Sequence, residues 1–267
     1  SIRAGAAGFS TNRFLGHYMP DGRHVPGTHA LHEEVEAIAA EVGAAGGLMQ
    51  NVLNLGGNFE GEAELLRKEA KAANGRILFS ITAGAKDSSG QRVKNLLEEL
   101  NADGLDVSAI SVPRGTGFLT GLQCGFPWKS DAWHQLADMD LAARLVAIND
   151  ITFCEKLVTE ASENPGLPPE ELFWMGTESQ PDYLGSTSLS AMAEEAGEHP
   201  AQTYLRLARE TDGLGLFTMQ FFNKNLKALA NLFSSDHCLP GLGDAGAHVG
   251  QVMDSGWSTF VLTHWHK

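Results

Sequence analysis

The chain is poor in cysteine and in basic residues, and it has no long apolar run. Its three cysteines, Cys124, Cys154 and Cys238, form no C-x-x-C pair, which argues against a disulfide framework and against a zinc finger. No apolar stretch reaches the length of a membrane span, and no leader-like segment opens the chain. These features predict a cytoplasmic protein. With 19 Lys and Arg against 33 Asp and Glu, the net charge of −14 disfavours nucleic acid and anionic membranes as partners.

Two common hydrolase motifs are also missing. Without G-x-S-x-G the sequence offers no serine-hydrolase elbow, and without H-E-x-x-H it offers no helical zinc-protease site. What remains is a globular composition, 43% hydrophobic and 19% charged. The 267 residues suffice for one barrel-sized domain or two ordinary ones.

Apolar segments alternate with helical segments in the first half of the chain. Thr28 is a candidate N-cap for the first helix, and Asn74 lies where a left-handed residue would end the second. The strands begin about thirty residues apart, the size of one βα unit, which predicts a parallel sheet. The predicted strands are 48–55, 77–83 and 105–112, and the predicted helices are 30–42, 60–73 and 91–100.

The second half is less regular. Residues 114–129 are rich in glycine, proline and aromatic residues and are predicted to form a long ordered loop. Repeated βα units favour a (β/α) barrel or an open doubly wound sheet. Five or six strands are fewer than a barrel needs, so we expect an incomplete one. Further predicted helices are 131–148, 151–161, 186–196, 201–209, 226–233 and 257–263, and further predicted strands are 172–175, 214–222 and 239–244.

Asp244 is the main candidate for chemistry. It follows a short apolar segment and lies in a run of glycines, with His248 four residues later. A strand that ends in an acid, followed by a tight turn, is how α/β enzymes hold a carboxylate at the mouth of a site. The alternative is a glycine-rich turn in which the aspartate binds nearby backbone amides.

Other polar side chains are candidate ligands for a substrate or a metal. Arg114 follows a strand and could either hold a carboxylate with two hydrogen bonds or form a structural ion pair. Gln50, inside an apolar strand, is either directed into a site or next to ordinary ladder neighbours. The histidines are weaker metal-ligand candidates. Four of them lie close together in a segment with glycine and proline, which favours a cluster on a surface loop over a metal site. That cluster is His17, His24, His29 and His32, and a separate H-x-H pair is His264 and His266.

Several segments together resemble the D-aminoacylase (N-acyl-D-amino-acid deacylase) branch of the amidohydrolase superfamily. They run in order through nearly the whole chain and are 8–13, 21–28, 181–183, 241–250 and 262–265. The resemblance implies a metal-dependent, TIM-like (β/α) barrel that hydrolyses amide bonds. In such enzymes a metal activates a water, and an aspartate at the end of the last barrel strand takes its proton and passes it to the leaving amine. Asp244 matches that aspartate.

The chain departs from the family's histidine pattern. The H-x-H that follows the first barrel strand in this family would lie upstream of Ser1, and the strands near 49–51 and 80–82 contain no histidine. Gln50 and Thr82 are the nearest polar residues, and an amide or a hydroxyl is a poor zinc ligand beside imidazole. The resemblance therefore supports the fold and Asp244 more than it supports a standard zinc site.

The leading hypothesis is a single, incomplete amidohydrolase-like barrel domain over residues 1–267 that hydrolyses carbon–nitrogen bonds of a small molecule, with N-acyl amino acids as candidate substrates. Asp244 would be the acid/base and a ligand of zinc or another divalent metal. His248 would orient the substrate, Arg114 would bind an anionic group, and Gln50 would contact the substrate. The other hypothesis is a non-catalytic homologue or assembly subunit without a metal. A homo-oligomer, or association with missing barrel segments, is compatible with both.

Overall fold

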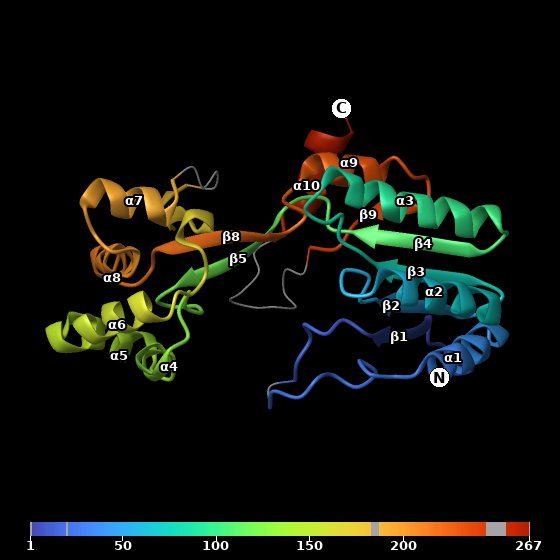
Figure 1. Ribbon diagram of the computed structural model, residues 1–267, viewed down its shortest axis with the longest axis horizontal. Coiled ribbons are helices and arrows are strands. Elements are labelled where there is room, and N and C mark those ends of the chain that lie inside the picture. The colour runs from blue at the N-terminus through green and yellow to red at the C-terminus, as the bar shows by residue number, and fades with distance from the viewer. Residues whose placement is uncertain (1, 20, 183–186, 244–254, 267) are drawn as a thin grey trace. The chain divides into compact units, whose positions relative to one another are not determined.

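The computed structural model describes residues 2–19, 21–182, 187–243 and 255–266 (Figure 1). It divides into two compact units. The first comprises residues 1–115, 222–242 and 256–267, and the second comprises 116–221 and 243–255. Most of the second unit is therefore one insertion into the sequence of the first. The prediction of one incomplete barrel domain over 1–267 stays a prediction.

The first unit is built on a five-stranded parallel sheet with the order β1-β2-β3-β4-β9. Successive strands along the chain are neighbours, and each is parallel to the next. The α/β class with a parallel sheet is thus confirmed, whereas closure into a barrel stays a prediction. The strands are β1 (Gly8–Asn12), β2 (Leu48–Val52), β3 (Arg76–Ser80), β4 (Asp106–Ser111) and β9 (Cys238–Pro240).

Four helices cover one face of this sheet. They bury a continuous core against alternate strand residues such as Met49, Phe79 and Ala109. Right-handed crossovers between strands that follow in order place every helix on the same side, as in a singly wound sheet. The helices are α1 (His32–Ala44), α2 (Phe59–Ala73), α3 (Asp87–Ala102) and α9 (Leu226–Phe233). Short helical segments, Ile2–Ala4, α10 (Trp257–Phe260) and the π-helical turn Val261–Trp265, complete the unit.

The opposite face of the sheet carries the other set of alternate residues. Gln50, Val52, Leu78, Ser80 and Ile110 are half-buried there, and none of them belongs to the helix–sheet core. A doubly wound sheet would have helices on this face as well. Among the described residues the sheet is therefore wound in one direction only.

The second unit has a four-stranded sheet in the order β5-β8-β6-β7, and β6 is antiparallel to both β7 and β8. Its core is aromatic, with Trp128, Trp133, Tyr204 and Phe217 buried together. The strands are β5 (Thr116–Gly121), β6 (Phe173–Thr177), β7 (Gln180–Pro181) and β8 (Leu216–Phe222). The helices are α4 (Asp131–Ala137), α5 (Leu141–Asn149), α6 (Ile151–Glu163), the 3-10 turn Pro169–Glu171, α7 (Leu189–Ala196) and α8 (Pro200–Glu210).

Several local predictions are wrong. Residues 116–121 form a strand rather than part of a loop. The predicted helix 131–148 is two helices, because Asp140 caps a new start by accepting a hydrogen bond from the Ala143 amide at 2.8 Å. Thr28 does not cap α1, since its hydroxyl donates to the Val25 carbonyl instead.

No helix among the described residues is both long and apolar enough to cross a membrane.

Candidate functional site

The carboxyl ends of the five parallel strands define one edge of the first unit's sheet. Loops that leave this edge carry the binding and catalytic residues of α/β enzymes, because side chains from several strands converge there. The polar residues at this edge come from β1 to β4 and from the loops that follow them.

Gln50 lies on the open face of the sheet, between the side chains of Ser10 on β1 and Ser80 on β3. Its amide nitrogen donates to Ser80 Oγ at 3.3 Å and to the Asn51 carbonyl at 3.0 Å, and the Ser10 hydroxyl donates to its amide oxygen. The structure thus places Gln50 on the face of the sheet opposite the four helices. Its amide is satisfied by neighbouring residues of the sheet, as one of the two interpretations predicted, and whether Gln50 contacts a substrate stays a prediction.

At the end of β1, Asn12 pairs with His17, a contact that the sequence did not indicate. His17 Nδ1 is 2.6 Å from Asn12 Oδ1, and the Asn12 amide nitrogen donates to the Phe14 carbonyl at 3.2 Å and to Thr28 Oγ1 at 3.3 Å. These bonds fix the Asn12 oxygen toward the imidazole, which makes Nδ1 the protonated nitrogen. Both residues line a cavity of about 540 Å³ beside β1. Asn12, a polar residue at the end of a strand, is the signal that the sequence offers. Its partner His17 lies in the following loop, where no local pattern marks the pairing.

The four loop histidines have different contacts in the described structure. His17 pairs with Asn12, whereas His24 Nδ1 lies 2.8 Å from His29 Nε2 and its ring packs on Tyr18. In the described ranges, no group of three or more His, Cys, Asp or Glu side chains converges as a metal site would require. At the other end of the chain, His264 stacks on Phe260, with ring centroids 4.7 Å apart.

Arg114 follows β4, as predicted, and its guanidinium carbon lies 5.7 Å from the centre of the Phe260 ring. The indole nitrogen of Trp265 donates to the Pro113 carbonyl at 2.7 Å, which holds the C-terminal helical segment against the same loop. This segment consists of α10 and the π-helical turn that follows it, so the predicted helix 257–263 is confirmed. Whether Arg114 contacts a substrate stays a prediction.

Asn223 organises the ends of β3 and β4 and was missed by sequence analysis. Its amide nitrogen donates to Ser111 Oγ at 3.1 Å and to the Val112 carbonyl at 2.7 Å, and its oxygen accepts from the Ala83 amide at 2.7 Å. The residue is buried and has a φ of 54°, a conformation that asparagine tolerates better than most residues. An isolated asparagine after a strand carries no sequence signal for this role.

Asp244 and His248 lie outside the described residues. The chain that leads to them is described as far as residue 243, and the Gly241 amide donates to the Ser111 carbonyl at 2.9 Å. This bond continues the parallel pairing of β9 with β4 to the very end of β4.

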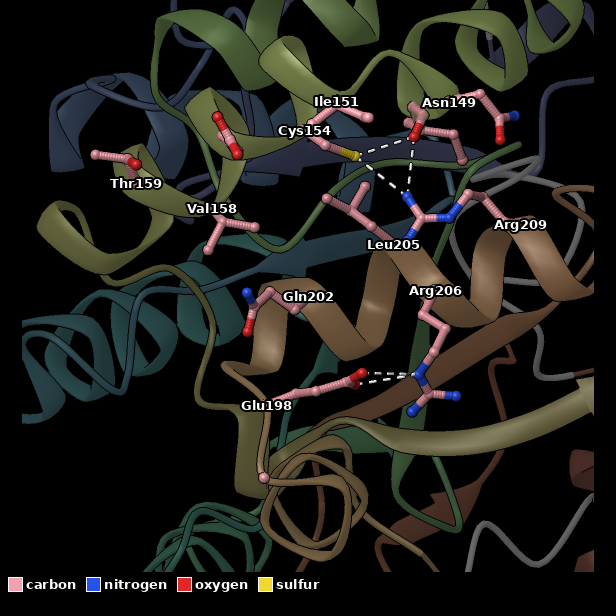
Figure 2. Close-up of a pocket in the computed structure, with 13 residues that line it drawn as sticks. Asn149, Ile151, Cys154, Val158, Thr159, Glu198, Gln202, Leu205, Arg206 and Arg209 are labelled. Carbon is pink, nitrogen blue, oxygen red and sulfur yellow. Dashed lines mark hydrogen bonds and ion pairs between the residues drawn. The ribbon is translucent and has the colours of Figure 1, made fainter.

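The second unit contains a cavity of about 960 Å³ between α6 and α8, and none of the residues predicted for a site lines it (Figure 2). Two arginines face it, but both have protein partners. Arg209 donates to the Ile148 carbonyl at 2.9 Å and lies 3.2 Å from Cys154 Sγ. It thereby satisfies a carbonyl near the end of α5, which is a structural role.

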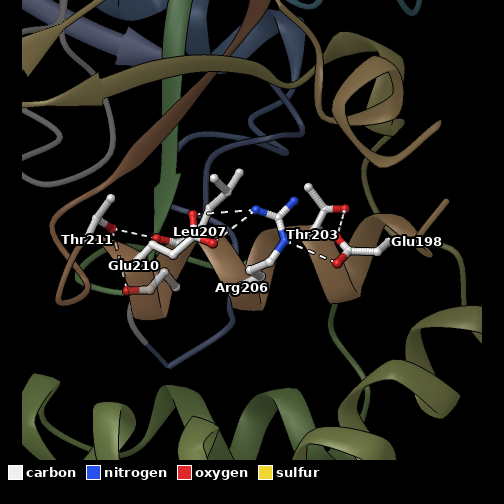
Figure 3. Close-up of polar contacts among 7 residues, drawn as sticks. Glu198, Thr203, Arg206, Leu207, Glu210 and Thr211 are labelled. Carbon is white, nitrogen blue, oxygen red and sulfur yellow. Dashed lines mark hydrogen bonds and ion pairs between the residues drawn. The ribbon is translucent and has the colours of Figure 1, made fainter. Parts of the chain in front are cut away.

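Arg206, the other arginine, belongs to an ion-pair network along α8 (Figure 3). Its Nε lies 3.1 Å from Glu198 Oε1, and its Nη1 lies 3.2 Å from Glu210 Oε1. The Thr203 hydroxyl, which donates to Glu198 at 2.7 Å, and then the Arg206 guanidinium hold the pKa of the Glu198 carboxyl below its usual range. Both arginines at this cavity are therefore engaged in contacts with other protein groups, and we place the candidate site at the sheet edge.

No family model and no curated protein matches the chain. Among solved structures the chain is similar to three of D-aminoacylase. One is described by the functional role of its binuclear metal centre, one is a mutant in complex with copper chloride, and one is described as defining a novel subset of amidohydrolases. The sequence identities are 16%, 15% and 16%, and each TM-score is 0.43. Each match covers 90% of this chain but only 39% of the D-aminoacylase chain.

Proposed function

We propose that the chain is part of a barrel-type hydrolase that cleaves carbon–nitrogen bonds in small molecules, with N-acyl amino acids as the substrate class. The observation that carries this proposal is the place of β9. It lies parallel to β4, with Pro240 opposite Ser111, so the segment that leads to Asp244 leaves the sheet at the edge where the other strands end. Active sites of (β/α) enzymes lie at that edge. A cytoplasmic location and a small-molecule substrate belong to the same proposal.

In this proposal Asp244 is the general acid/base. It accepts a proton from the attacking water and returns it to the leaving amine. His248 orients the substrate, and Arg114 binds its carboxylate. Gln50 contacts the amide from the open face of the sheet, and the Asn12–His17 pair forms a polar wall beside it.

A resident divalent metal does not fit the described residues. The polar side chains on the open face are amides and hydroxyls, which bind zinc poorly beside imidazole, and no acidic or histidine cluster accompanies them in the described part of the chain. The proposed reaction therefore contains no step through a metal. Zinc or another divalent metal, with Asp244 as a ligand, stays a prediction.

The function is tested by incubating the purified chain with N-acetyl derivatives of D- and L-amino acids and measuring amine release, with and without added zinc. We expect turnover above the buffer blank that depends on Asp244. The metal content of the same preparation is measured in parallel. No amine release above the blank from a preparation of known metal content, with or without added zinc, would contradict a hydrolase.

One observation favours a second function, a non-catalytic homologue or assembly subunit. Gln50 is hydrogen-bonded to Ser10 and to Ser80, so the described part of the open face presents neutral groups here rather than an acid or a base. Such a protein would bind N-acyl amino acids without hydrolysing them. Calorimetric binding of N-acetyl amino acids with no amine released over hours would support this function and count against the first.

Replacing Gln50 by alanine is expected to raise KM for the N-acyl substrate about 2- to 10-fold with a smaller change in kcat. The lost contact is a neutral hydrogen bond, which contributes about 0.5–1.5 kcal/mol. Steady-state kinetics measures the effect. Gln91, an exposed residue of α3, provides the control, because its replacement by alanine should leave KM unchanged. An unchanged KM in the Gln50 variant would remove this residue from the site.

A further inference from the structure

Asn51 and Glu69 form a buried polar pair in the helix–sheet layer of the first unit. Asn51 lies on the helix-covered face of β2, Glu69 lies on α2, and both residues are 0% exposed. The Asn51 amide nitrogen donates a hydrogen bond to Glu69 Oε2. The core around them is otherwise apolar, which makes any unpartnered polar atom there unfavourable.

Two oxygen atoms of this pair have no donor. Asn51 Oδ1 and Glu69 Oε1 are both buried, and neither has a hydrogen-bond partner among the described residues. An ionised carboxylate can only accept hydrogen bonds, so it cannot satisfy the amide oxygen. Exchanging the nitrogen and oxygen of the Asn51 amide does not help, because one amide oxygen would still face a carboxylate oxygen. A proton on the carboxyl group removes both deficits at once.

We propose that folded Glu69 keeps a proton at neutral pH and donates it from Oε1 to Asn51 Oδ1, so that the two side chains form a closed acid–amide pair. The first unit thereby contains a proton-binding site that couples folding to pH. The pair joins α2 to β2 next to Gln50, since Gln50 also donates to the Asn51 carbonyl. The proposal does not depend on the enzymatic function.

The charges that face the pair do not offset the burial of an ionised Glu69. Arg13, in the loop after β1, favours ionisation, but its guanidinium is engaged by Glu62, which lies two turns earlier on α2 and opposes ionisation. Toward α2, the neighbouring α1 and β3 contribute buried apolar residues (Val35, Ala39, Val42, Ile77 and Phe79). The charged contacts between α2 and α3 are surface ion pairs, which join Arg67 to Glu99 and Asp103, and Glu60 to Arg92. Burial raises the pKa of Glu69 to about 8, against the opposing effects of the Asn51 hydrogen bond and Arg13.

The sign of the pH dependence follows from this direction. Below about 4.5, the ordinary value, Glu69 is protonated in the folded and the unfolded chain alike. Between about 4.5 and 8 only the unfolded chain releases the proton, so stability falls as the pH rises. Above about 8 the contribution is lost, because the folded protein then holds an ionised carboxylate in an apolar layer.

The test replaces Glu69 by glutamine, whose amide can donate to Asn51 Oδ1 and accept from its nitrogen at every pH. Denaturant unfolding is measured at pH 5, 7 and 9 for the wild type and for Glu69→Gln. We expect the unfolding equilibrium constant of the wild type, relative to Glu69→Gln, to rise about tenfold per pH unit between pH 5 and 8. Equal pH dependence of the two proteins would overturn the proposal.

A matched control and a second measurement protect the test. Glu64→Gln removes an exposed carboxyl from the same helix and should keep the wild-type pH dependence. If Glu69→Gln fails to fold, the wild type labelled with ¹³C at the glutamate carboxyl carbons is titrated by NMR. One carboxyl resonance that changes with a midpoint above pH 7 supports the closed pair, and titration of every glutamate below pH 6 overturns it.

Discussion

Replacement of Asp244 by asparagine is expected to lower kcat/KM for hydrolysis of an N-acyl amino acid by about 10²- to 10⁴-fold. Asparagine has nearly the same shape as aspartate, but it can neither take a proton from the attacking water nor return one to the leaving amine. The loss should fall mainly on kcat, since proton transfer occurs in the transition state rather than in the bound ground state. Steady-state kinetics of amine release measures the change.

Asp236 provides the matched control for this variant. It is an exposed aspartate two residues before β9, so its replacement by asparagine changes the same charge close in sequence without touching the sheet edge. We expect Asp236→Asn to retain wild-type kinetics. Wild-type turnover in Asp244→Asn would remove the acid/base role and leave the fold without an identified catalytic group.

The elements of the first unit were predictable because their signals are local. In α2 the apolar residues Leu65, Leu66 and Ala70 recur at helical spacing, and Asn74 ends the helix in the left-handed conformation with φ 43° and ψ 43°. Regular spacing of apolar strands was enough to predict the parallel sheet. Each of these patterns identifies a helix, a helix end or a strand from a few neighbouring residues. None of them depends on segments that are distant in the sequence.

The second unit was harder to predict because its strand signals are weak. The strand β5 contains two glycines, two threonines and only two large apolar residues. Apolar and polar residues therefore do not alternate clearly along it. The antiparallel arrangement depends on pairing between β6 and β8, which lie about forty residues apart in the sequence. Aspartate is a common N-cap residue, so Asp140 is a local signal for a new helix start. The apolar spacing of a helix continues across it, however, which hides the break.

The site is less predictable than the fold because its contacts join residues far apart in the sequence. Gln50 was identified because it interrupts an apolar strand, but its partners Ser10 and Ser80 come from neighbouring strands. Asn223 contacts residues more than a hundred positions away, and no local pattern marks it. Polar residues at strand ends are visible in a sequence, whereas their partners depend on strand order.

Replacement of Glu62 by alanine is expected to destabilise the first unit by about 3–5 kcal/mol, because it leaves the Arg13 charge buried without a partner. The Arg13 and Glu62 side chains are 13% and 5% exposed, and their charged atoms approach to 2.9 Å. Glu62 also accepts from the Asn54 amide at 3.3 Å, and Arg13 donates to the Ala30 carbonyl. The pair therefore connects the loop after β1 to α2. Denaturant unfolding of both proteins measures the loss.

The double variant Arg13→Met with Glu62→Leu separates the cost of a lone charge from the value of the pair. Buried ion pairs lose much of their attraction to desolvation, so apolar replacement of both partners is often neutral or stabilising. We expect the double variant to recover most of the stability that Glu62→Ala loses, although the Asn54 amide and the Ala30 carbonyl each lose a partner. A double variant as unstable as Glu62→Ala would mean that the backbone bonds of the pair, rather than its charges, hold the loop after β1 in place at the edge of the candidate site.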